Sequence, residues 1–269
     1  MMIAAERREL IVQKIKASKF VSIQELSKEF SVTEMTIRRD LDFMTRQGLI
    51  KRSHGGALIN DKVGLESEFD TKKIQLSETK EAIGRKAASL ISAGDCIAID
   101  CGTTAFEVSR FIANIPDLKV ISASIPVIAE LIQYPEINVI CTGGELSIKD
   151  KSLIGSTAIR TIQDYILDKV FIGVAGISFD FGFTMFNMND TLVKRALIER
   201  AREVIVVADS SKIGITRHAY FCEIEKANKI ITDSGISSED YQEFLNMGIE
   251  VIIADKDKVN IGENDNRNI

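Results

Sequence analysis

Side chains suited to contacting DNA are concentrated near the start of the sequence. The candidates for this role are Ser22, Thr33, Met35, Thr36, Arg38, Arg39, Lys51, Arg52 and His54. An arginine can donate two hydrogen bonds to a guanine, a threonine can touch a base edge, and lysines pair with phosphates whatever the base sequence. Taken alone, Arg38 and Arg39 are better explained as a solvated helix face paired with Asp42. The neighbouring elements must decide between these interpretations.

Polar loops that follow apolar runs form a second group of candidate binding residues. They are Asp100-Cys101-Gly102-Thr103-Thr104, Ser122-Ala123-Ser124, Gly143-Gly144 and Asp209-Ser210-Ser211-Lys212. Backbone amides and hydroxyls at a helix N-terminus suit a phosphate or another anion. Each loop also has a structural interpretation, in which the glycines permit tight turns, Thr103 or Ser124 caps a helix and Asp209-Ser210-Ser211-Lys212 is a structural cap. Lys194, on the predicted helix that begins at Thr191, would then be a solvated cation. Because ligands bind at the carboxyl ends of parallel strands, the recurrence of such loops favours a binding site.

The first 57 residues contain, in order, the elements of a winged helix-turn-helix. The predicted elements are a helix over Glu6–Ala17, a short helix opened by Ser22, a helix over Thr33–Arg46 and a hairpin over Leu49–Ala57. Ser22 and Glu25 have the spacing of a capping box, and Thr33 suits an N-cap. The apolar stripe of the third helix turns Arg38 and Arg39 outward. We therefore expect this helix to enter the major groove, while cations of the wing and of the first helix hold phosphates.

The charge is divided unevenly along the chain, whose net charge is -5. Residues 1–57 carry eleven lysines and arginines against seven aspartates and glutamates, a net charge of +4, which leaves -9 for the remainder. A small basic module joined to a larger acidic domain explains this division. No apolar run reaches the ~18 residues that a membrane span needs, and the first residues lack the apolar core of a signal peptide. We therefore expect a cytoplasmic protein with no membrane partner.

Beyond residue 76, apolar runs alternate with helical patterns, which indicates an α/β domain with a mainly parallel sheet. The predicted strands are Cys96–Ile99, Val120–Ser122, Val139–Cys141, Val170–Val174, Val204–Ala208, Lys229–Ile231 and Val251–Ile253. The predicted helices are Glu78–Ala93, Phe106–Ile112, Val127–Gln133, Thr191–Arg202 and Ser238–Met247. We expect four segments: a winged helix-turn-helix at 1–57, a linker at 58–76, an effector-sensing α/β domain at 77–258 and a disordered tail at 259–269.

The cysteines do not form a pattern that binds a metal or builds a disulfide framework. They are Cys96, Cys101, Cys141 and Cys222. They lie far apart, without a C-x-x-C spacing or a nearby pair of histidines, so we expect no metal site. Cys101 lies within one of the polar loops, which leaves a thiol redox switch open as an alternative.

Several motifs of the chain resemble the DeoR family of bacterial repressors. In the first domain they are Thr36-Ile37-Arg38-Arg39-Asp40-Leu41, Gly48-Leu49 and Arg52-Ser53-His54-Gly55-Gly56-Ala57. In the second they are Asp100-x-Gly-Thr-Thr, Gly143-Gly144, Phe171-Ile172-Gly173, Gly182-Phe183-Thr184, Val193-Lys194-Arg195 and Ala208-Asp209-Ser210-Ser211-Lys212. The resemblance implies that Thr36, Arg38 and Arg39 contact DNA.

The same resemblance implies a second domain that is similar in fold to ribose-5-phosphate isomerase and senses phosphorylated sugars. The pocket residues that it implies are Asp100, Gly102, Thr103, Thr104, Gly143, Gly144 and Lys194, and we add Ser122 and Ser124 from the loop analysis. The chain departs from the family pattern in places. Family members often have Thr-Asn-Ser where this chain has Ser122-Ala123-Ser124, an arginine in place of Ser147, and a polar, acidic or glycine residue near Ala175. Because the cation at position 147 is missing, a sugar acid or a polyol derivative becomes an alternative to a sugar phosphate.

Two functions are compatible with these residues and motifs. The first is a repressor of a carbohydrate operon that binds double-stranded operator DNA as a homodimer or homotetramer and is released by a small-molecule effector. The alternative is a sugar-phosphate isomerase, which needs a carboxylate base. Asp100 is a candidate base, but the corner Val174-Ala175-Gly176 lacks the acidic residues that enzymes of this fold carry there. We therefore favour the repressor and expect no catalytic residues and no cofactor.

Overall fold

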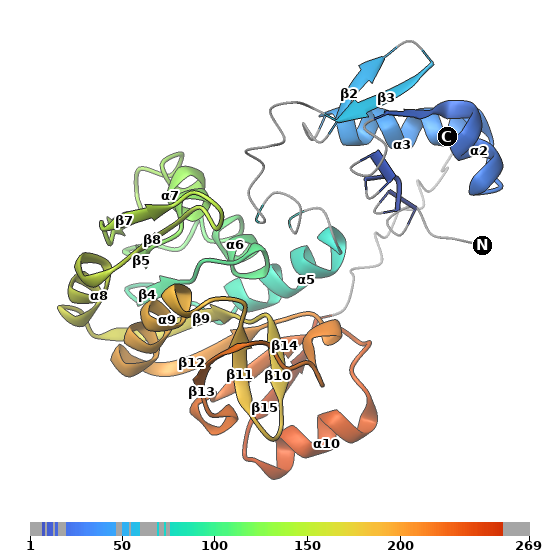
Figure 1. The fold of residues 1–269 in the computed structure, drawn as a ribbon. Helices are drawn as coiled ribbons and strands as arrows, with labels where there is room; N and C mark the ends of the chain where they lie inside the picture. Colours follow the sequence, from blue (N-terminus) through green and yellow to red (C-terminus); the bar gives the residue numbers. More distant parts are fainter. Residues whose placement is uncertain are drawn as a thin grey trace, which may run out of the picture. The chain divides into compact units, whose positions relative to one another are not determined.

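The computed structural model describes residues 7–8, 10–12, 14–15, 20–46, 50–53, 55–59, 69, 73 and 76–254. The chain divides into two compact units, and the boundary between them falls after Ser77 (Figure 1). The expected helix cap Gly48, the wing residue His54, most of the linker and the tail at 259–269 lie outside the described residues.

The first unit is a winged helix-turn-helix built around one apolar core. Its elements are helical residues between 7 and 15, β1 (Phe20–Ser22), α2 (Ile23–Glu29), α3 (Glu34–Arg46), β2 (Ile50–Ser53) and β3 (Gly56–Ile59). The strands form an antiparallel sheet in the order β1-β3-β2. The core draws on every element and consists of Ile11, Ile15, Val21, Ile23, Leu26, Ile37, Leu41, Met44, Ile50 and Ala57. The predicted class of this unit is confirmed.

Local signals in the sequence set where these helices begin. The Ser22 hydroxyl accepts a hydrogen bond from the Glu25 amide at 3.1 Å, and the Glu25 carboxylate accepts one from the Ser22 amide at 3.3 Å. This is the predicted capping box, which satisfies two amides that the helix leaves unbonded. The wing differs from the prediction, because β1 adds a third strand and β3 continues to Ile59, beyond the predicted end of the domain at residue 57.

The second unit is built on a seven-stranded parallel sheet. Its strands are β4 (Cys96–Ile99), β5 (Lys119–Ser122), β6 (Asn138–Cys141), β9 (Leu167–Gly173), β12 (Ala201–Val207), β14 (Lys229–Thr232) and β15 (Glu250–Ile253). They lie in the order β15-β14-β12-β9-β4-β5-β6, and every neighbouring pair is parallel. Each corresponds to one of the predicted strands, so the mainly parallel α/β class is confirmed.

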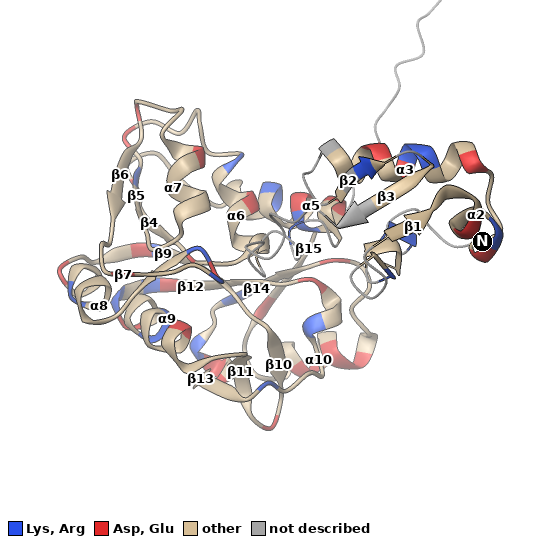
Figure 2. Ribbon diagram, turned by 45° about the horizontal axis from the view of Figure 1, so that its top comes forward, with Lys and Arg blue, Asp and Glu red and all other residues tan. Residues whose placement is uncertain are grey.

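Helices cover both faces of this sheet. They are α5 (Ser77–Ala88), α6 (Thr103–Ser109), α7 (Ile125–Leu131), α8 (Ser156–Gln163), α9 (Met188–Arg200) and α10 (Ser238–Asn246). Figure 2 shows α5, α6 and α7 on one side of the sheet and α8 and α9 on the other. In β9, Val170 and Ile172 belong to a hydrophobic cluster that contains residues of α8 and α9. Phe171, which lies between them in the strand and outside this cluster, is equally buried. Burial of successive residues is expected for a parallel sheet covered on both faces.

Two small antiparallel sheets and one helix were not predicted. A hairpin consists of β7 (Glu145–Ser147) and β8 (Ser152–Ile154), and a three-stranded sheet consists of β10 (Gly176–Ser178), β11 (Gly182–Met185) and β13 (Ala219–Cys222). Helix α8 was also missed. Segments this short carry too few residues for their periodicity to separate strand from helix or loop.

The order of the strands reverses between β4 and β9. From β4 the chain moves outward through β5 and β6, and it then returns to β9 on the other side of β4 and continues through β12, β14 and β15. At such a reversal the loops at the carboxyl ends of the two strands run in opposite directions, which leaves a crevice where ligands bind. A ligand site is therefore expected where β4 ends before Asp100 and β9 ends at Gly173.

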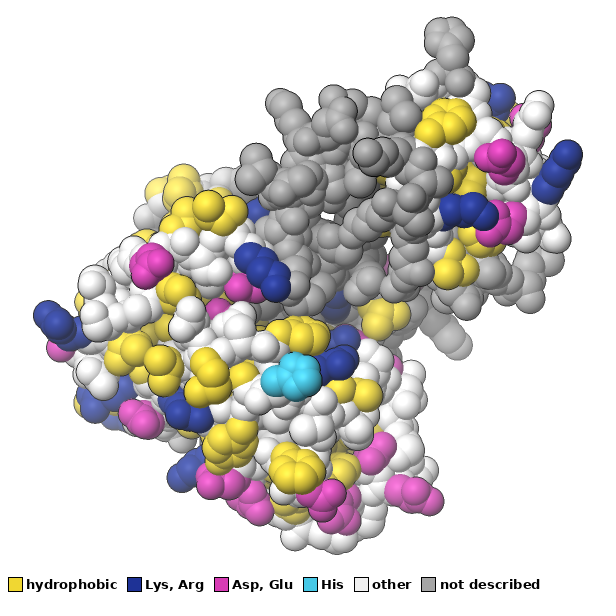
Figure 3. Space-filling view, viewed as in Figure 1, with side chains coloured by type: hydrophobic (Ala, Val, Ile, Leu, Met, Phe, Trp, Pro, Cys, Tyr) yellow, Lys and Arg dark blue, Asp and Glu magenta, His cyan; other side chains and the backbone are white. Residues whose placement is uncertain are grey.

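Exposed apolar side chains gather on one face of the second unit (Figure 3). We call the following set the α9 patch: Phe186, Met188, Leu192 and Tyr220. Met188 and Leu192 belong to α9, which packs against β13, the strand that carries Tyr220. Arginines flank the patch, because Arg217 lies over the Phe186 ring and Arg195 over the Tyr220 ring. Apolar side chains that lie together on a surface mark candidate contact regions.

Candidate DNA-binding surface and effector site

The outer face of α3 carries several of the residues predicted to contact DNA. Met35 is 60% exposed, Arg38 and Arg39 are also exposed, and Thr36 is half-buried. Arg38 Nη2 lies 3.6 Å from Glu34 Oε2 one turn earlier, an exposed pair that contributes little to stability. Figure 2 shows both basic and acidic positions along the ribbon of this helix. The face is therefore a mixed surface from which two arginines project.

The wing is linked to α3 through an arginine. Arg52 Nε in β2 lies 3.5 Å from Asp42 Oδ1 in α3. Asp42 of α3 thus pairs with the wing. Lys51 precedes Arg52 in the same strand.

Two of the predicted DNA contacts also act in helix caps. The Ser22 hydroxyl accepts the Glu25 amide, as described above. The Thr33 hydroxyl accepts the Thr36 amide at 3.2 Å and lies 2.9 Å from the Thr36 hydroxyl. These bonds define the first turn of α3, the part of a recognition helix that approaches the bases. The Ser22 hydroxyl, which accepts one such bond, retains its donor and a second lone pair for another contact.

A buried carboxylate that sequence reasoning did not single out holds α3 against the first helix. Asp40 is 2% exposed, and its two oxygens accept hydrogen bonds from Arg7 Nε and Arg8 Nε, each at 2.7 Å. Arg8 also lies over the Phe43 ring, 4.1 Å from its centroid. These arginines therefore position α3. This corrects the expectation for Arg7 and Arg8 that cations of the first helix hold phosphates.

Asp100 and Lys194 form a buried ion pair in the crevice between β4 and β9. Each is 1% exposed, and Lys194 Nζ donates a hydrogen bond to Asp100 Oδ2. The same carboxylate oxygen accepts the Gly173 amide at 2.9 Å, and Lys194 also donates to the Gly173 carbonyl at 2.8 Å. The pair therefore joins the end of β4, the end of β9 and α9. Sequence analysis assigned Asp100 and Lys194 to one site, and the structure brings them into contact.

Two serines of the candidate effector site take part in local hydrogen bonds. The Ser122 hydroxyl donates to the Ile99 carbonyl at 2.7 Å and accepts the Ser124 amide at 3.0 Å. Ser124 is the N-cap of α7 and accepts the Val127 amide at 3.5 Å. These bonds shape the loop after β5 at the same sheet edge as Asp100.

The remaining candidates shape the neighbouring loops. Gly102 is the N-cap residue of α6, and Thr103 and Thr104 are buried in its first turn. Gly143 and Gly144 have φ angles of 69° and 112°. A Cβ atom on Gly144 would lie 2.4 Å from a backbone oxygen of β8, so this close approach requires glycine.

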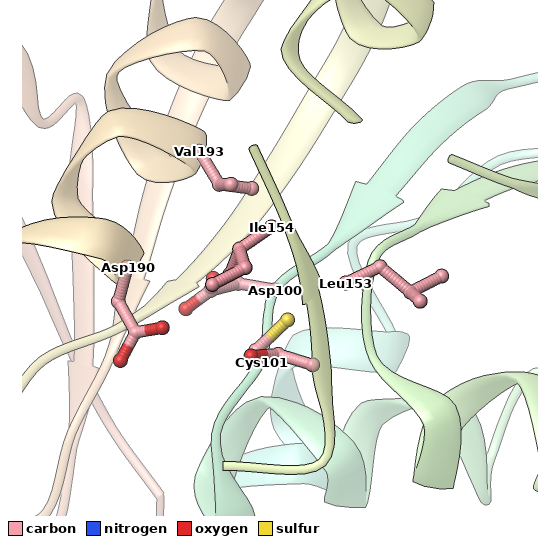
Figure 4. A pocket seen from close by; sticks show the side chains of 7 residues that line it. Asp100, Cys101, Leu153, Ile154, Asp190 and Val193 are labelled. Atoms are coloured by element: carbon pink, nitrogen blue, oxygen red, sulfur yellow. The ribbon is translucent and has the colours of Figure 1, made fainter. Parts of the chain in front are cut away.

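A pocket with about 180 Å³ of empty space lies beside the ion pair (Figure 4). Its lining consists of Asp100, Cys101, Ser152, Leu153, Ile154, Asp190 and Val193. Of these, Asp100 belongs to the predicted effector site. The others were missed because β8 is too short to be recognised and because Asp190 precedes the predicted start of its helix at Thr191.

The loop after β12 forms a separate network of hydrogen bonds. Asp209 caps the short helix η2 (Ser210–Lys212) by accepting the Ser211 amide at 3.2 Å. The Ser210 hydroxyl donates to Asp233 Oδ1 at 2.9 Å. These contacts agree with the structural interpretation of this loop.

The thiols differ in their surroundings. Burial raises the pKa of the Cys222 thiol to about 12, and burial also raises the pKa of Cys96. Cys141 is exposed, and Cys101 is half-buried and lines the pocket. Within the described ranges, no three potential metal ligands are grouped together. Among the described helices, none combines the length and the apolar character that crossing a membrane requires.

Comparisons with known proteins match both units. Residues 7–63 match the model of the DeoR-like helix-turn-helix domain, and residues 75–234 match that of the DeoR C terminal sensor domain. The Uncharacterized HTH-type transcriptional regulator YulB of Bacillus subtilis (strain 168) is 35% identical over 87% of this chain and 91% of its own length. The Glycerol-3-phosphate regulon repressor of Escherichia coli (strain K12) is 33% identical over 85% of this chain and 90% of its own length. A solved ribose 5-phosphate isomerase A from Methanocaldococcus jannaschii aligns with a TM-score of 0.38 and 19% identity over 50% of this chain and 53% of its own.

A winged helix-turn-helix followed by an α/β sensor domain defines a DNA-binding transcriptional regulator that responds to a small molecule. The chain belongs to the DeoR family, since the sensor model alone matches more than half of it. The predicted family is thereby confirmed.

Proposed function

We propose that this regulator represses a carbohydrate operon by binding double-stranded operator DNA and that a sugar-derived effector releases it. The observation that carries the proposal is the outward face of α3, where Arg38 and Arg39 project from a helix-turn-helix. The name of the Glycerol-3-phosphate regulon repressor supports a phosphorylated compound as the effector. A sugar acid or a polyol derivative is the other class, because Ser147 replaces an arginine of the family pattern.

In this proposal α3 enters the major groove and the wing follows the phosphate backbone. The proposed DNA contacts are Ser22, Thr33, Met35, Thr36, Arg38, Arg39, Lys51, Arg52 and His54. Arg38 and Arg39 contact bases, whereas Lys51 and Arg52 contact phosphates. Base contacts depend on the DNA sequence and phosphate contacts do not, so the two groups can be told apart by experiment.

Replacing the two arginines of α3 tests the proposal. Arg38→Ala and Arg39→Ala should each weaken binding by ~1 to 3 kcal/mol, with relaxed preference at the base concerned. The measurement is fluorescence anisotropy on a DNA site that the wild-type protein selects from a random library. Arg160→Ala is the matched control, because Arg160 is an exposed arginine on α8. Wild-type affinity in the Arg38→Ala/Arg39→Ala double variant would refute α3 as the recognition helix.

The effector site of the proposal lies at the reversal of the strand order. Its residues are Asp100, Gly102, Thr103, Thr104, Ser122, Ser124, Gly143, Gly144 and Lys194. The Asp100–Lys194 pair supports this position because it joins three elements that meet at the crevice. An effector that binds one arrangement of these elements more tightly than another shifts the protein toward that arrangement.

We propose regulation without catalysis, and the competing function is a sugar-phosphate isomerase. Asp100 Oδ2 accepts hydrogen bonds from Lys194 and from the Gly173 amide, so this oxygen is already occupied and is not free to act as a base. Ala175 is buried at the corner where an acidic residue would be needed. Asp190 also lines the pocket, so a direct assay is the appropriate test. Turnover of pentose or hexose phosphates by the purified chain would favour the enzyme.

We further propose that the protein acts as a homodimer or homotetramer. Helix-turn-helix regulators bind paired half-sites that mirror the symmetry of the protein. A net charge of +4 on residues 1–57 is modest for a DNA-binding module that acts alone. The α9 patch supports the proposal as a surface that a second copy would cover.

A further inference from the structure

We propose that the pocket beside β4 binds the hydroxyl-bearing carbon chain of the effector, with Ser152 and Asp190 as its hydrogen-bonding partners, and that the anionic group of the effector lies outside this pocket. The inference rests on the proposed function, because it specifies which part of the effector the sensor domain recognises. Neither residue belongs to the effector site that the sequence predicts.

The chemistry of the lining suits hydroxyl groups better than a phosphate. Two of the seven lining residues are carboxylates, one carries a hydroxyl and none is a cation. Lys194, which contacts this lining through Asp100, already donates hydrogen bonds to that carboxylate and to Gly173. A buried phosphate beside Asp100 and Asp190 would meet like charge, whereas a sugar hydroxyl can donate to a carboxylate.

Ser152 supplies the polar group that points most directly to a ligand. It is 1% exposed, it lines the pocket, and its hydroxyl has no hydrogen-bond partner among the residues that the structure describes. Leaving a buried hydroxyl unsatisfied costs on the order of 1 to 3 kcal/mol, so such a group requires an explanation. A hydroxyl of a bound effector would satisfy it.

The backbone around Ser152 holds it firmly at this position. Ser152 forms an antiparallel bridge with Ser124, and its neighbours continue the contact. The Leu153 amide donates to the Ala123 carbonyl at 2.7 Å, and the Ile125 amide donates to the Lys151 carbonyl at 2.9 Å. The Ser152 side chain therefore extends from a strand fixed to the loop after β5, and a change of backbone would break these bonds.

Asp190 lies on the α9 side of the pocket, and Asp100 and Cys101 lie on the β4 side (Figure 4). Its position is set by Asn187, whose side-chain amide donates to Asp190 Oδ2 at 3.0 Å and whose carbonyl oxygen accepts the Asp190 amide at 3.1 Å. Two carboxylates and a hydroxyl thus enclose the pocket from three elements. Such a set can bind several hydroxyl groups of one carbon chain.

The remaining lining of the pocket agrees with this occupant. Leu153, Ile154 and Val193 provide aliphatic surface that can pack against the C–H groups of a polyol. The empty space of about 180 Å³ includes open solvent, so the pocket is a crevice that is continuous with the solvent. An effector whose carbon chain enters this crevice can extend outside it, where its anionic group lies.

Matched ligands with and without a phosphate test the inference. The probes are hexitols, pentitols and hexonates, each with and without a terminal phosphate ester, together with inorganic phosphate. Binding to the full-length chain is measured by isothermal titration calorimetry. The matched pair of ligands that binds the wild-type protein most tightly is then used to compare the variants. Ser152→Ala should weaken both members of that pair by the same factor, roughly 2- to 10-fold, and Asp190→Asn by roughly 10- to 100-fold.

A second buried serine provides the control. Ser109 is fully buried and its hydroxyl donates to the Phe106 carbonyl at 2.7 Å. Ser109→Ala should lower the melting temperature and leave ligand affinity unchanged. Ser152→Ala should leave the melting temperature of the free protein unchanged or raise it, because it removes an unsatisfied hydroxyl. If Ser152 had only a structural role, Ser152→Ala would instead lower the melting temperature and leave ligand affinity unchanged.

Three outcomes would overturn the inference. The first is that Ser152→Ala binds both ligands of the matched pair with wild-type affinity. The second is that the variants lose affinity for the phosphorylated ligand alone, and the third is that no polyhydroxylated probe binds the wild-type protein. Affinity for the selected DNA site is measured for the same samples. If the wild-type protein does not bind DNA, the proposed function fails, whereas DNA binding with unchanged ligand affinity of the variants defeats only the assignment of the pocket.

Discussion

At the scale of single residues, two aspartates of α3 have different roles. Asp42 is exposed and pairs with Arg52 of the wing, whereas Asp40, two positions earlier, is buried between Arg7 and Arg8. A buried carboxylate is tolerated here because two guanidinium groups satisfy its oxygens. The Arg38-Arg39-Asp40 motif thus combines two outward cations with one inward anchor.

Removal of this anchor should destabilise the first unit. Asp40→Ala removes the carboxylate that accepts a hydrogen bond from the buried Arg7, and breaking a buried ion pair costs about 3 to 5 kcal/mol. Asp42→Ala is the control and should cost less than about 1 kcal/mol, because its pair with Arg52 is partly exposed. Urea unfolding followed by circular dichroism measures both variants. Equal stability of the two would show that the buried pair does not hold α3 in place.

At the scale of elements, the wing is a three-stranded sheet in which a glycine allows two neighbouring strands to lie close enough to pair. In the register of the sheet Gly56 lies opposite Ser22 of β1, and a Cβ atom on Gly56 would lie 2.1 Å from the Val21 carbonyl oxygen. A backbone atom in a paired strand cannot move aside as a flexible side chain can. Gly56 therefore allows β1 and β3 to pair, and this pairing fixes the wing beside α2.

Substitution of this glycine should separate the strands. Gly56→Ala is expected to destabilise the first unit by about 1 to 3 kcal/mol, as overpacking does, and to weaken DNA binding. Gly55→Asn is the control: Gly55 has a φ of 81° with open space around it, and asparagine tolerates that conformation. Hydrogen exchange at the β3 amides reports strand pairing directly. Unchanged protection in Gly56→Ala would contradict the role given to this residue.

At the scale of the whole molecule, α9 connects the pocket with the outer surface of the sensor domain. One side of the helix contributes Asp190, Val193 and Lys194 to the pocket and the ion pair, and the other exposes Met188 and Leu192 in the α9 patch. An effector that contacts the inner side can therefore alter the outer side. If the protein is the oligomer proposed above, this arrangement provides a physical route from effector binding to the association of its subunits.

The α9 patch should be necessary for oligomer formation. Leu192→Arg places a charge within the apolar surface and is expected to lower the molar mass of the protein in solution, because an unpaired charge buried in an interface is costly. Ile132→Arg is the control, since Ile132 is 74% exposed after α7 and lies outside the patch. Multi-angle light scattering after size-exclusion chromatography measures the mass. The same mass for Leu192→Arg and the wild type would exclude this surface as the interface.

The sequence by itself determined the family, the α/β class, the winged helix-turn-helix and all seven strands of the parallel sheet. These features depend on signals between near neighbours, such as the Ser22–Glu25 capping box and the periodicity of apolar residues. It also indicated Asp100, from the polar loop after a predicted strand, and Lys194, through a family motif. Only the tertiary structure decided that these two meet, that Asp40 is buried and that Ser152 and Asp190 line the same pocket. Asp100 and Lys194 are 94 positions apart, and their contact depends on the order of the strands, which spacing along the chain does not encode.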